Sequence, residues 1–266
     1  MALTTIRKGE LEYLIAPEIT AAHCFTTRLG GVSKGAVGAL NLGWNRGDLP
    51  ENVEENYAII ARELNIRPEN FVLTHQTHSD IVRVVDKRDA KGLDNRAYPE
   101  CDALITNDPG TALVVFSADC TPILLQDPVT GAVGALHAGW RGTAAGLAEK
   151  TVLAMVREFG CKPENIRAAI GPNIGQCCFQ TDGDVRDAML AALGETANAY
   201  ITPKEEKYYV NLKGLNAAFL QRAGVKNITV AEECTFCQSH RFWSHRKVGA
   251  NRGSQGAVIL CKEGTP

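Results

Sequence analysis

The sequence predicts a mixed α/β protein in a single domain, with β-sheets flanked by helices. Three observations support this fold class: short β-rich segments are spread along the chain, amphipathic helical segments alternate with them, and no change in composition marks a linker. With 266 residues, the chain is long enough to bury a substantial core. We therefore expect one domain over residues 1–266.

Eight short segments have the composition of strands. Each is rich in β-branched or other apolar residues and is bounded by Gly, Pro, Asp or Asn. They cover residues 80–86, 101–106, 111–118, 122–126, 131–137, 207–212, 227–231 and 256–261.

Three segments have the pattern of helices. In residues 49–66, Asp48 and Pro50 supply start signals, and four apolar side chains share one helical face (Val53, Tyr57, Ile60 and Leu64). Residues 143–160 predict a second helix and residues 211–224 a third, and each ends at a glycine. Residues 86–101, in contrast, form a long polar segment that is either a disordered connector or a lid.

Charge and cysteine content narrow the function classes. The net charge is −2 and basic residues form no long run, so we expect neither a nucleic acid nor a membrane surface as partner. The first 19 residues lack a long apolar core, which predicts neither a signal peptide nor an anchor. Nine cysteines, an odd number, indicate reduced thiols rather than a disulfide framework, and we expect a cytoplasmic protein.

A predicted hairpin brings a cysteine close to a histidine. The strands 122–126 and 131–137 flank a turn-rich stretch, DPVT, which predicts an antiparallel pair. If that stretch forms the whole loop, Gln126 pairs with Gly131 and Cys120 lies opposite His137. A longer loop shifts this register, so the prediction is proximity of the two side chains rather than one fixed pairing.

A cysteine beside a histidine allows three interpretations. The pair is either a buried structural contact, or a nucleophile activated by its base, or part of a metal site. His75 and His78 of LTHQTHSD are candidates for a further ligand. Two histidines and one cysteine suit a borderline-soft ion such as Zn²⁺.

Eight stretches occur in an order typical of one protein family: FTTRLGGVSKG, ALNLGWNRGD, HQTHSD, CDALIT, SADCTPILL, LHAGWRGTAAGL, IGPNIGQCCF and CTFCQSHRFWSHR. The chain resembles the laccase-domain family, whose members are described as multicopper polyphenol oxidases and as zinc-containing purine nucleoside phosphorylases. The resemblance spans about residues 25–261. It implies a layered α/β/β/α sandwich similar to cysteine-dependent toxin deamidases.

The resemblance also implies an activity. Members split adenosine, inosine and methylthioadenosine with phosphate into a base and ribose 1-phosphate, and they deaminate adenosine. The family's metal ligands, which also act in catalysis, correspond to His78, Cys120 and His137. Zn²⁺ is the expected ion, and copper is the alternative. His75 is an additional imidazole for which we expect a structural role.

Five further residues are expected to contact purine nucleoside or phosphate. Arg141 follows the HAGW turn at the start of a helix, where an anion is favoured, although it could instead form a salt bridge with a nearby aspartate (Asp119 or Asp102). The other four are Arg246, Arg28, Asn41 and Asp119.

Other functions stay open. One is a hydrolase with Cys120 as nucleophile, His137 as base and Asp119 or Asp102 orienting it, since some relatives are linked to editing of peptidoglycan precursors. Another is a non-enzymatic metal- or nucleoside-binding protein. A polyphenol oxidase with a multicopper centre is disfavoured, because six histidines are too few for its ligands. The number of subunits cannot be predicted.

Two more cysteine pairs invite interpretation. Cys234 and Cys237 of CTFC, with His240 and His245 nearby, have the spacing of half a zinc ribbon. Because the resemblance assigns this segment to the substrate pocket, a second metal is not expected. The adjacent cysteines in QCCF predict a packed strand or turn rather than a redox pair, since cysteines next to each other in sequence do not readily form a disulfide.

Overall fold

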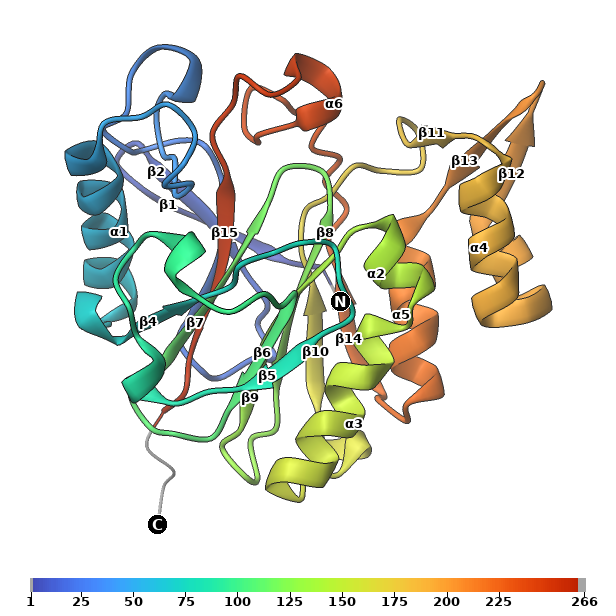
Figure 1. The fold of residues 1–266 in the computed structure, drawn as a ribbon, viewed down its shortest axis with the longest axis horizontal. Helices are drawn as coiled ribbons and strands as arrows, with labels where there is room; N and C mark the ends of the chain where they lie inside the picture. The colour runs from blue at the N-terminus through green and yellow to red at the C-terminus, as the bar shows by residue number, and fades with distance from the viewer. Residues whose placement is uncertain (1, 263–266) are drawn as a thin grey trace.

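The computed structural model describes residues 2–262 and shows two six-stranded β-sheets between layers of helices (Figure 1). The first sheet is antiparallel except for its last pair. Its order is β1 (Thr4–Lys8), β2 (Leu11–Ile15), β3 (His23–Thr26), β15 (Gln255–Leu260), β7 (Ala112–Ser117) and β4 (Phe71–Leu73).

The second sheet carries a parallel pair at each edge and antiparallel pairs in its centre. Its order is β14 (Asn227–Val230), β10 (Arg167–Ile170), β8 (Thr121–Gln126), β9 (Val133–Ala138), β6 (Ala103–Thr106) and β5 (Val82–Val84). Strands β7 and β15 of the first sheet contact β8 and β9 of the second, so the two sheets pack face to face.

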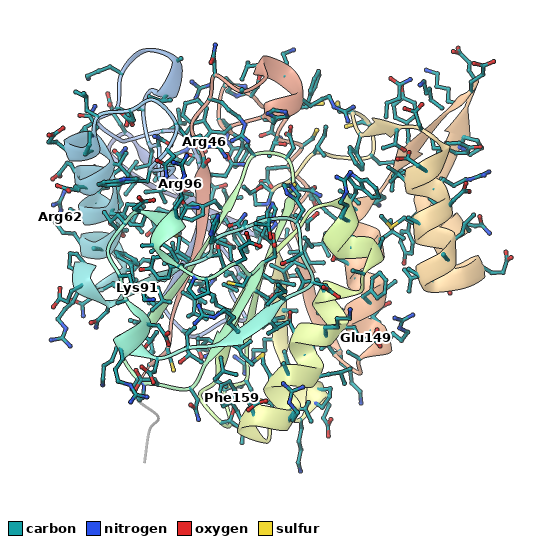
Figure 2. The ribbon with its side chains drawn as sticks, in the orientation of Figure 1. Arg46, Arg62, Lys91, Arg96, Glu149 and Phe159 are labelled. Atoms are coloured by element: carbon teal, nitrogen blue, oxygen red, sulfur yellow. The ribbon has the colours of Figure 1, made fainter. Side chains whose placement is uncertain are left out.

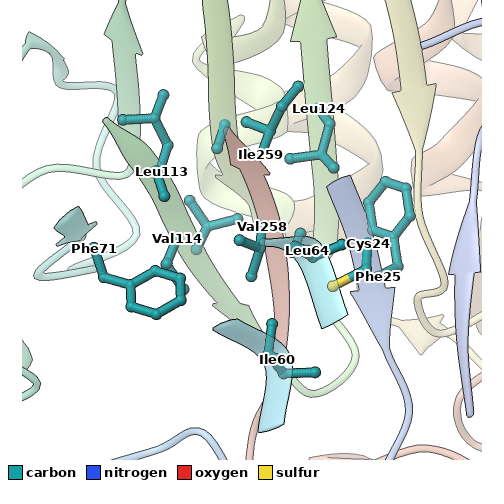
Figure 3. Close-up of a cluster of buried hydrophobic side chains, with 14 of the residues drawn as sticks. Cys24, Phe25, Ile60, Leu64, Phe71, Leu113, Val114, Leu124, Val258 and Ile259 are labelled. Atoms are coloured by element: carbon teal, nitrogen blue, oxygen red, sulfur yellow. The ribbon is translucent and has the colours of Figure 1, made fainter. Parts of the chain in front are cut away.

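Helices cover the outer face of each sheet, which gives the layer order α/β/β/α. Helix α1 (Pro50–Leu64) packs on the first sheet, and α3 (Leu147–Phe159) and α5 (Leu212–Arg222) pack on the second. Strand alternation separates the two cores: Leu104 and Leu124 face the first sheet, whereas Ile105 and Ile123 pack beneath the helices. Figure 3 shows side chains of α1, β15 and β8 in the buried apolar cluster around the first sheet (Ile60, Leu64, Val258, Ile259 and Leu124).

A smaller unit protrudes from one end of the sandwich, at the right of Figure 1. It contains a three-stranded sheet and α4 (Gly183–Leu193), which share their own apolar cluster. The strands are β11 (Gln180–Thr181), β12 (Ile201–Lys204) and β13 (Lys207–Val210).

The remaining helices are short. They are α2 (Trp140–Ala144), α6 (His245–Val248) and the 3-10 turns η1 (Gly35–Val37), η2 (Pro68–Asn70), η3 (Lys87–Asp89), η4 (Asn95–Ala97), η5 (Pro163–Asn165) and η6 (Gly194–Tyr200). Within residues 2–262, no helix has the length and apolar character needed to cross a membrane.

The structure confirms the eight predicted strands, with ends that shift by no more than two residues. The hairpin β8–β9 is antiparallel as predicted. The pairing that a four-residue loop would give does not occur, because His137 pairs with Pro122 and not with Cys120. The loop is longer than four residues: the Asp127 side chain accepts the Val129 amide, and the Asp127 amide reaches Ala132. The shift of two residues preserves the strand face, so Cys120 and His137 still meet.

Two further predictions need correction. The helix predicted over residues 143–160 is divided into α2 and α3, because Gly146 adopts a left-handed conformation with φ 72°. The long polar segment 86–101 is not a disordered connector. It contains η3 and η4, and Tyr98 anchors it by bonding the Phe71 and Gly92 carbonyls.

A sharp test of the packing is at Gly171, just after β10. A Cβ at Gly171 would lie 2.3 Å from Cδ1 of the fully buried Phe25 ring, so Gly171→Ala forces the core to move. We expect a loss of about 1–3 kcal/mol in the free energy of unfolding, measured by urea denaturation. Gly183→Ala, where a Cβ meets nothing within 4 Å, is the matched control. Equal stability of the two variants would contradict the close contact between Gly171 and Phe25.

Candidate metal centre and its cavity

Three side chains from distant parts of the sequence converge at one end of the sheets. His78 comes from the loop after β4, Cys120 from the turn between β7 and β8, and His137 from β9. Their ligand atoms all lie within 4.8 Å of one another, and Cys120 Sγ is 3.8 Å from His78 Nε2. Ligands of a tetrahedral zinc lie about 3.3–3.8 Å apart, given bonds of roughly 2.0–2.3 Å. This metal triad therefore fits such an ion with little movement.

Asp102 organises both histidines of the metal triad. It is fully buried, and its Oδ1 lies 2.8 Å from His137 Nδ1, which leaves His137 Nε2 as the free ring nitrogen. Its Oδ2 accepts the Thr77 and Ser79 amides and the Ser79 hydroxyl at 2.7–3.1 Å, on either side of His78. One carboxylate thus fixes the loop of one ligand and the ring of another, as is usual around metal-binding histidines.

Two residues at this site have positive φ angles although they carry side chains. His78 has φ 61° and Asp119, next to Cys120, has φ 96°. Asp119 is held by three contacts: its carboxylate accepts the Thr235 hydroxyl and the Arg246 amide, each at 2.6 Å, and its carbonyl accepts the Ile174 amide. These bonds compensate an unfavourable backbone conformation that directs Cys120 toward the histidines.

The thiol of Cys120 and the imidazole of His137 favour each other's charged forms. Burial opposes ionisation of Cys120, but the His137 and His78 imidazoles outweigh it and lower the pKa of Cys120 to about 6. Burial also opposes a charged His137, but the Cys120 thiolate and the Asp102 carboxylate raise the pKa of His137 to about 9. The thiolate is the form that binds a metal or attacks an electrophile.

The metal triad opens into a cavity of about 280 Å³. Its wall also contains two aromatic side chains, Trp44 and Phe116, and the amides Asn45 and Asn95. The cavity is thus both polar and able to contact a planar ring.

Three guanidinium groups line the same cavity: Arg46, Arg96 and Arg252, here the arginine group. Figure 2 labels Arg46 and Arg96 close to one another above the centre of the sandwich. Arg252 is only 9% exposed, and its Nε has no hydrogen-bond partner within residues 2–262. Burial, assisted by Arg46, lowers the pKa of Arg252 to about 10. Three guanidinium groups on one wall, one of them buried, give the cavity a positive charge that favours an anion.

Residues 22–262 match the family model described as "Multi-copper polyphenol oxidoreductase laccase". The chain belongs to this laccase family.

Similar proteins carry a different activity in their names. The purine nucleoside phosphorylase of Deinococcus radiodurans is 39% identical over 250 residues, which cover 94% of this chain and 92% of that protein. The purine nucleoside phosphorylase YfiH of Escherichia coli is 36% identical over 227 residues, which cover 85% of this chain and 88% of that protein. The crystal structure of YlmD from Geobacillus stearothermophilus matches with a TM-score of 0.91 and 34% identity, over 97% of this chain and 99% of that one.

Histidines of this laccase-family chain gather at one place only within the described residues. Beyond the metal triad, His23 is buried with both ring nitrogens near backbone groups, and His75 Nδ1 lies 3.2 Å from the carbonyl of Tyr98. His240 and His245 lie exposed after β14. Residues 2–262 therefore contain one His₂Cys cluster and lack the several imidazole-rich sites of a multicopper oxidase.

The five predicted substrate contacts lie outside the residues that line the cavity. Arg141 is exposed on α2 and stacks on Trp140, and it forms no salt bridge with Asp119 or Asp102. Arg246 bonds the Gln180 carbonyl.

Three of these side chains have structural contacts instead. Arg28 stacks on Trp243 and bonds the carbonyls of Gly38 and Ser239. Asn41 is fully buried and bonds Asp48. Asp119 holds the Cys120 turn, as described above. None of the three is among the residues that line the cavity.

The arginine group was missed by sequence reasoning, although a signal exists. Each member directly follows an asparagine, in the pairs 45–46, 95–96 and 251–252, and two of the pairs continue into glycine. Neither charge nor periodicity marks these pairs, because they lie on three loops far apart in the sequence. Only the fold brings them to one wall.

Proposed function

We propose that this protein is a purine nucleoside phosphorylase that also deaminates adenosine, with zinc held by His78, Cys120 and His137. One observation carries the proposal: the metal triad and the arginine group face the same cavity. The names of similar proteins from several bacteria support the same activity.

Phosphate binds at the arginine group in this proposal. Phosphorolysis needs a dianion held beside the anomeric carbon while positive charge develops on the sugar. Arg252 supplies a largely buried guanidinium on the cavity wall, and Arg46 and Arg96 add charge at the cavity rim. Charge-assisted bonds from a guanidinium are strong and oriented, so they fix the nucleophile.

The nucleoside occupies the rest of the cavity. Trp44 and Phe116 offer faces on which a purine stacks, and the amides of Asn45 and Asn95 are donors and acceptors for base or sugar. Gln76 fixes Phe116, because its side chain bonds both the amide and the carbonyl of that residue at 2.6 and 2.9 Å.

The residues of the metal triad fit zinc in number, type and spacing. When bound there, zinc supplies Lewis acidity and lowers the pKa of a coordinated water, which is the chemistry that deamination requires. Cys120 contributes the thiolate, and Asp102 keeps His137 in the tautomer that presents Nε2. The donor set supports zinc, because one soft and two borderline ligands suit that ion.

A second candidate is a cysteine hydrolase. Its support is the Cys120 thiol with a pKa of about 6 next to a histidine that is oriented by a buried aspartate. A zinc ion bound through Cys120 would occupy the nucleophile, so metal content and hydrolase chemistry at this thiol are mutually exclusive. Loss of activity on zinc removal supports the phosphorylase, whereas gain of thiol-dependent activity supports the hydrolase.

Product analysis with three nucleosides tests the proposal. With phosphate, we expect inosine, adenosine and methylthioadenosine to release their bases together with a sugar 1-phosphate, measured by chromatography. Without phosphate, base release stops, whereas adenosine still yields inosine. Base release that is independent of phosphate, or no turnover of any of the three, contradicts the proposed function.

A further inference from the structure

A second cluster of metal-type ligands lies outside the cavity. It consists of four cysteines, Cys177, Cys178, Cys234 and Cys237, whose sulfur atoms all lie within 4.8 Å of one another. Cys237 Sγ is 3.8 Å from Cys177 Sγ and 3.3 Å from Cys178 Sγ. In a tetrahedral tetrathiolate zinc, with bonds of roughly 2.3 Å, neighbouring sulfurs lie about 3.8 Å apart. We propose that this sulfur cluster is a structural zinc site.

The fold brings the two cysteine pairs together. Cys177 and Cys178 lie in a turn between β10 and β11, and Cys234 and Cys237 lie in a turn after β14. A bridge between Asn173 and Cys234 aligns the two segments. The second pair has the C-x₂-C spacing of zinc-binding turns. His240 and His245, the possible ligands that the sequence suggested beside this half-site, are not part of the cluster, which contains the QCCF cysteines.

Backbone groups around the sulfur cluster suit thiolates. The Gly175 amide donates to Cys234 Sγ at 3.2 Å, and Cys234 is only 7% exposed. A Cβ at Gly175 would lie 3.1 Å from Cys234 Cβ and 3.2 Å from Cys177 Sγ, so glycine allows the backbone to approach the sulfurs. Amides that donate to sulfur stabilise its charged form, which is the form that binds metal.

A buried cation beside the sulfur cluster is a second, independent observation. Lys213 is 7% exposed, and its Nζ donates to the Ala231 and Glu233 carbonyls just before Cys234. It forms no ion pair with a carboxylate within residues 2–262. Zinc with four thiolates carries a net charge of −2. That negative charge would offset the cost of burying the Lys213 ammonium, whose hydrogen-bond partners are otherwise only carbonyl groups.

Hydrogen bonds connect the sulfur cluster to the turn that carries Cys120. Its first pair precedes the protruding unit, and its second pair precedes the segment that leads to α6. Thr235, between Cys234 and Cys237, bonds both the Asn173 carbonyl and the Asp119 carboxylate. A metal here therefore fixes the turn that presents Cys120.

Zinc content tests the site independently of the proposed function. The background variant His78→Ala/Cys120→Ser removes the metal triad, and we expect it to retain about one zinc per chain. Adding Cys178→Ser and Cys237→Ser should reduce zinc to near zero and lower the melting temperature. Adding Cys161→Ser, a buried cysteine outside both clusters, should leave zinc unchanged.

A measurement on the wild-type chain covers the case in which the quadruple variant fails to fold. A strong chelator should make five additional thiols reactive toward Ellman's reagent, four from the sulfur cluster and Cys120 from the metal triad. Co²⁺ reconstitution of the background variant, which lacks Cys120, should give the visible spectrum of a tetrahedral tetrathiolate. A background variant that lacks zinc, iron in place of zinc, or a Cys178–Cys237 disulfide in freshly alkylated protein would overturn the proposal.

Discussion

Replacing Asp102 with asparagine is expected to lower the zinc affinity of the metal triad about 10- to 100-fold. His137 binds a metal through Nε2 only when Nδ1 carries the hydrogen, and Asp102 accepts that hydrogen. An asparagine cannot accept both from His137 and from the Thr77 and Ser79 amides, because one of its two atoms is a donor. Either the tautomer of His137 or the loop of His78 must change.

Competition with a chromophoric chelator measures this affinity, with the sulfur cluster removed so that one site is titrated. Ser79→Ala is the matched control: it deletes one of the hydrogen bonds to Asp102 and leaves the carboxylate in place. We expect that variant to bind zinc nearly as tightly as the parent. Wild-type affinity in Asp102→Asn would show that the carboxylate does not position the ligands.

Replacing Arg252 with alanine is expected to raise the KM for phosphate about 10- to 100-fold, because a charge-assisted hydrogen bond contributes about 1.5–3 kcal/mol. The side chain lies on the cavity wall, so the change removes charge and fork geometry together. Arg252→Lys keeps the charge but loses the fork geometry, so its KM for phosphate should lie between those of the wild type and Arg252→Ala. Deamination of adenosine, which needs no phosphate, should change much less.

Arg141→Ala is the control for this experiment. Arg141 stacks on Trp140 outside the cavity, so we expect its loss to leave the KM for phosphate unchanged. The sequence predicted the opposite, since a helix start and a guanidinium together suggest an anion site. A raised KM in Arg141→Ala with a normal KM in Arg252→Ala would move the phosphate to α2.

The second sheet, except β10, could be predicted from the sequence because local patterns determine it, whereas only β7 and β15 of the first sheet were predicted. The buried strands β6 to β9 are continuous apolar runs between turn residues, and α1, α3 and α5 carry an apolar face. The register of β8–β9 could not be predicted, because the Asp127 side chain extends the loop through its own hydrogen bonds. Helix α4 and strands β11 and β12 lie in a largely exposed unit with weak periodicity.

The metal triad could be predicted in part from the sequence, whereas the arginine group could not. Cys120 directly precedes the first strand of one hairpin, and His137 lies near the end of the second strand. Both therefore lie at the open end of the hairpin, and their proximity follows from its antiparallel pairing. Residues of the arginine group lie on three loops whose meeting depends on both sheets. The sulfur cluster likewise depends on the alignment of two turns by the Asn173–Cys234 bridge.

The most direct test of the central claim is a ³¹P NMR measurement on inosine, orthophosphate and the wild-type protein. If the metal triad and the arginine group form one phosphorolytic site, a single new phosphomonoester resonance should grow in step with hypoxanthine, in equal amounts. It should fail to grow with Arg252→Ala at low phosphate. Hypoxanthine that forms without a new phosphorus resonance, or no hypoxanthine at all, would contradict the claim.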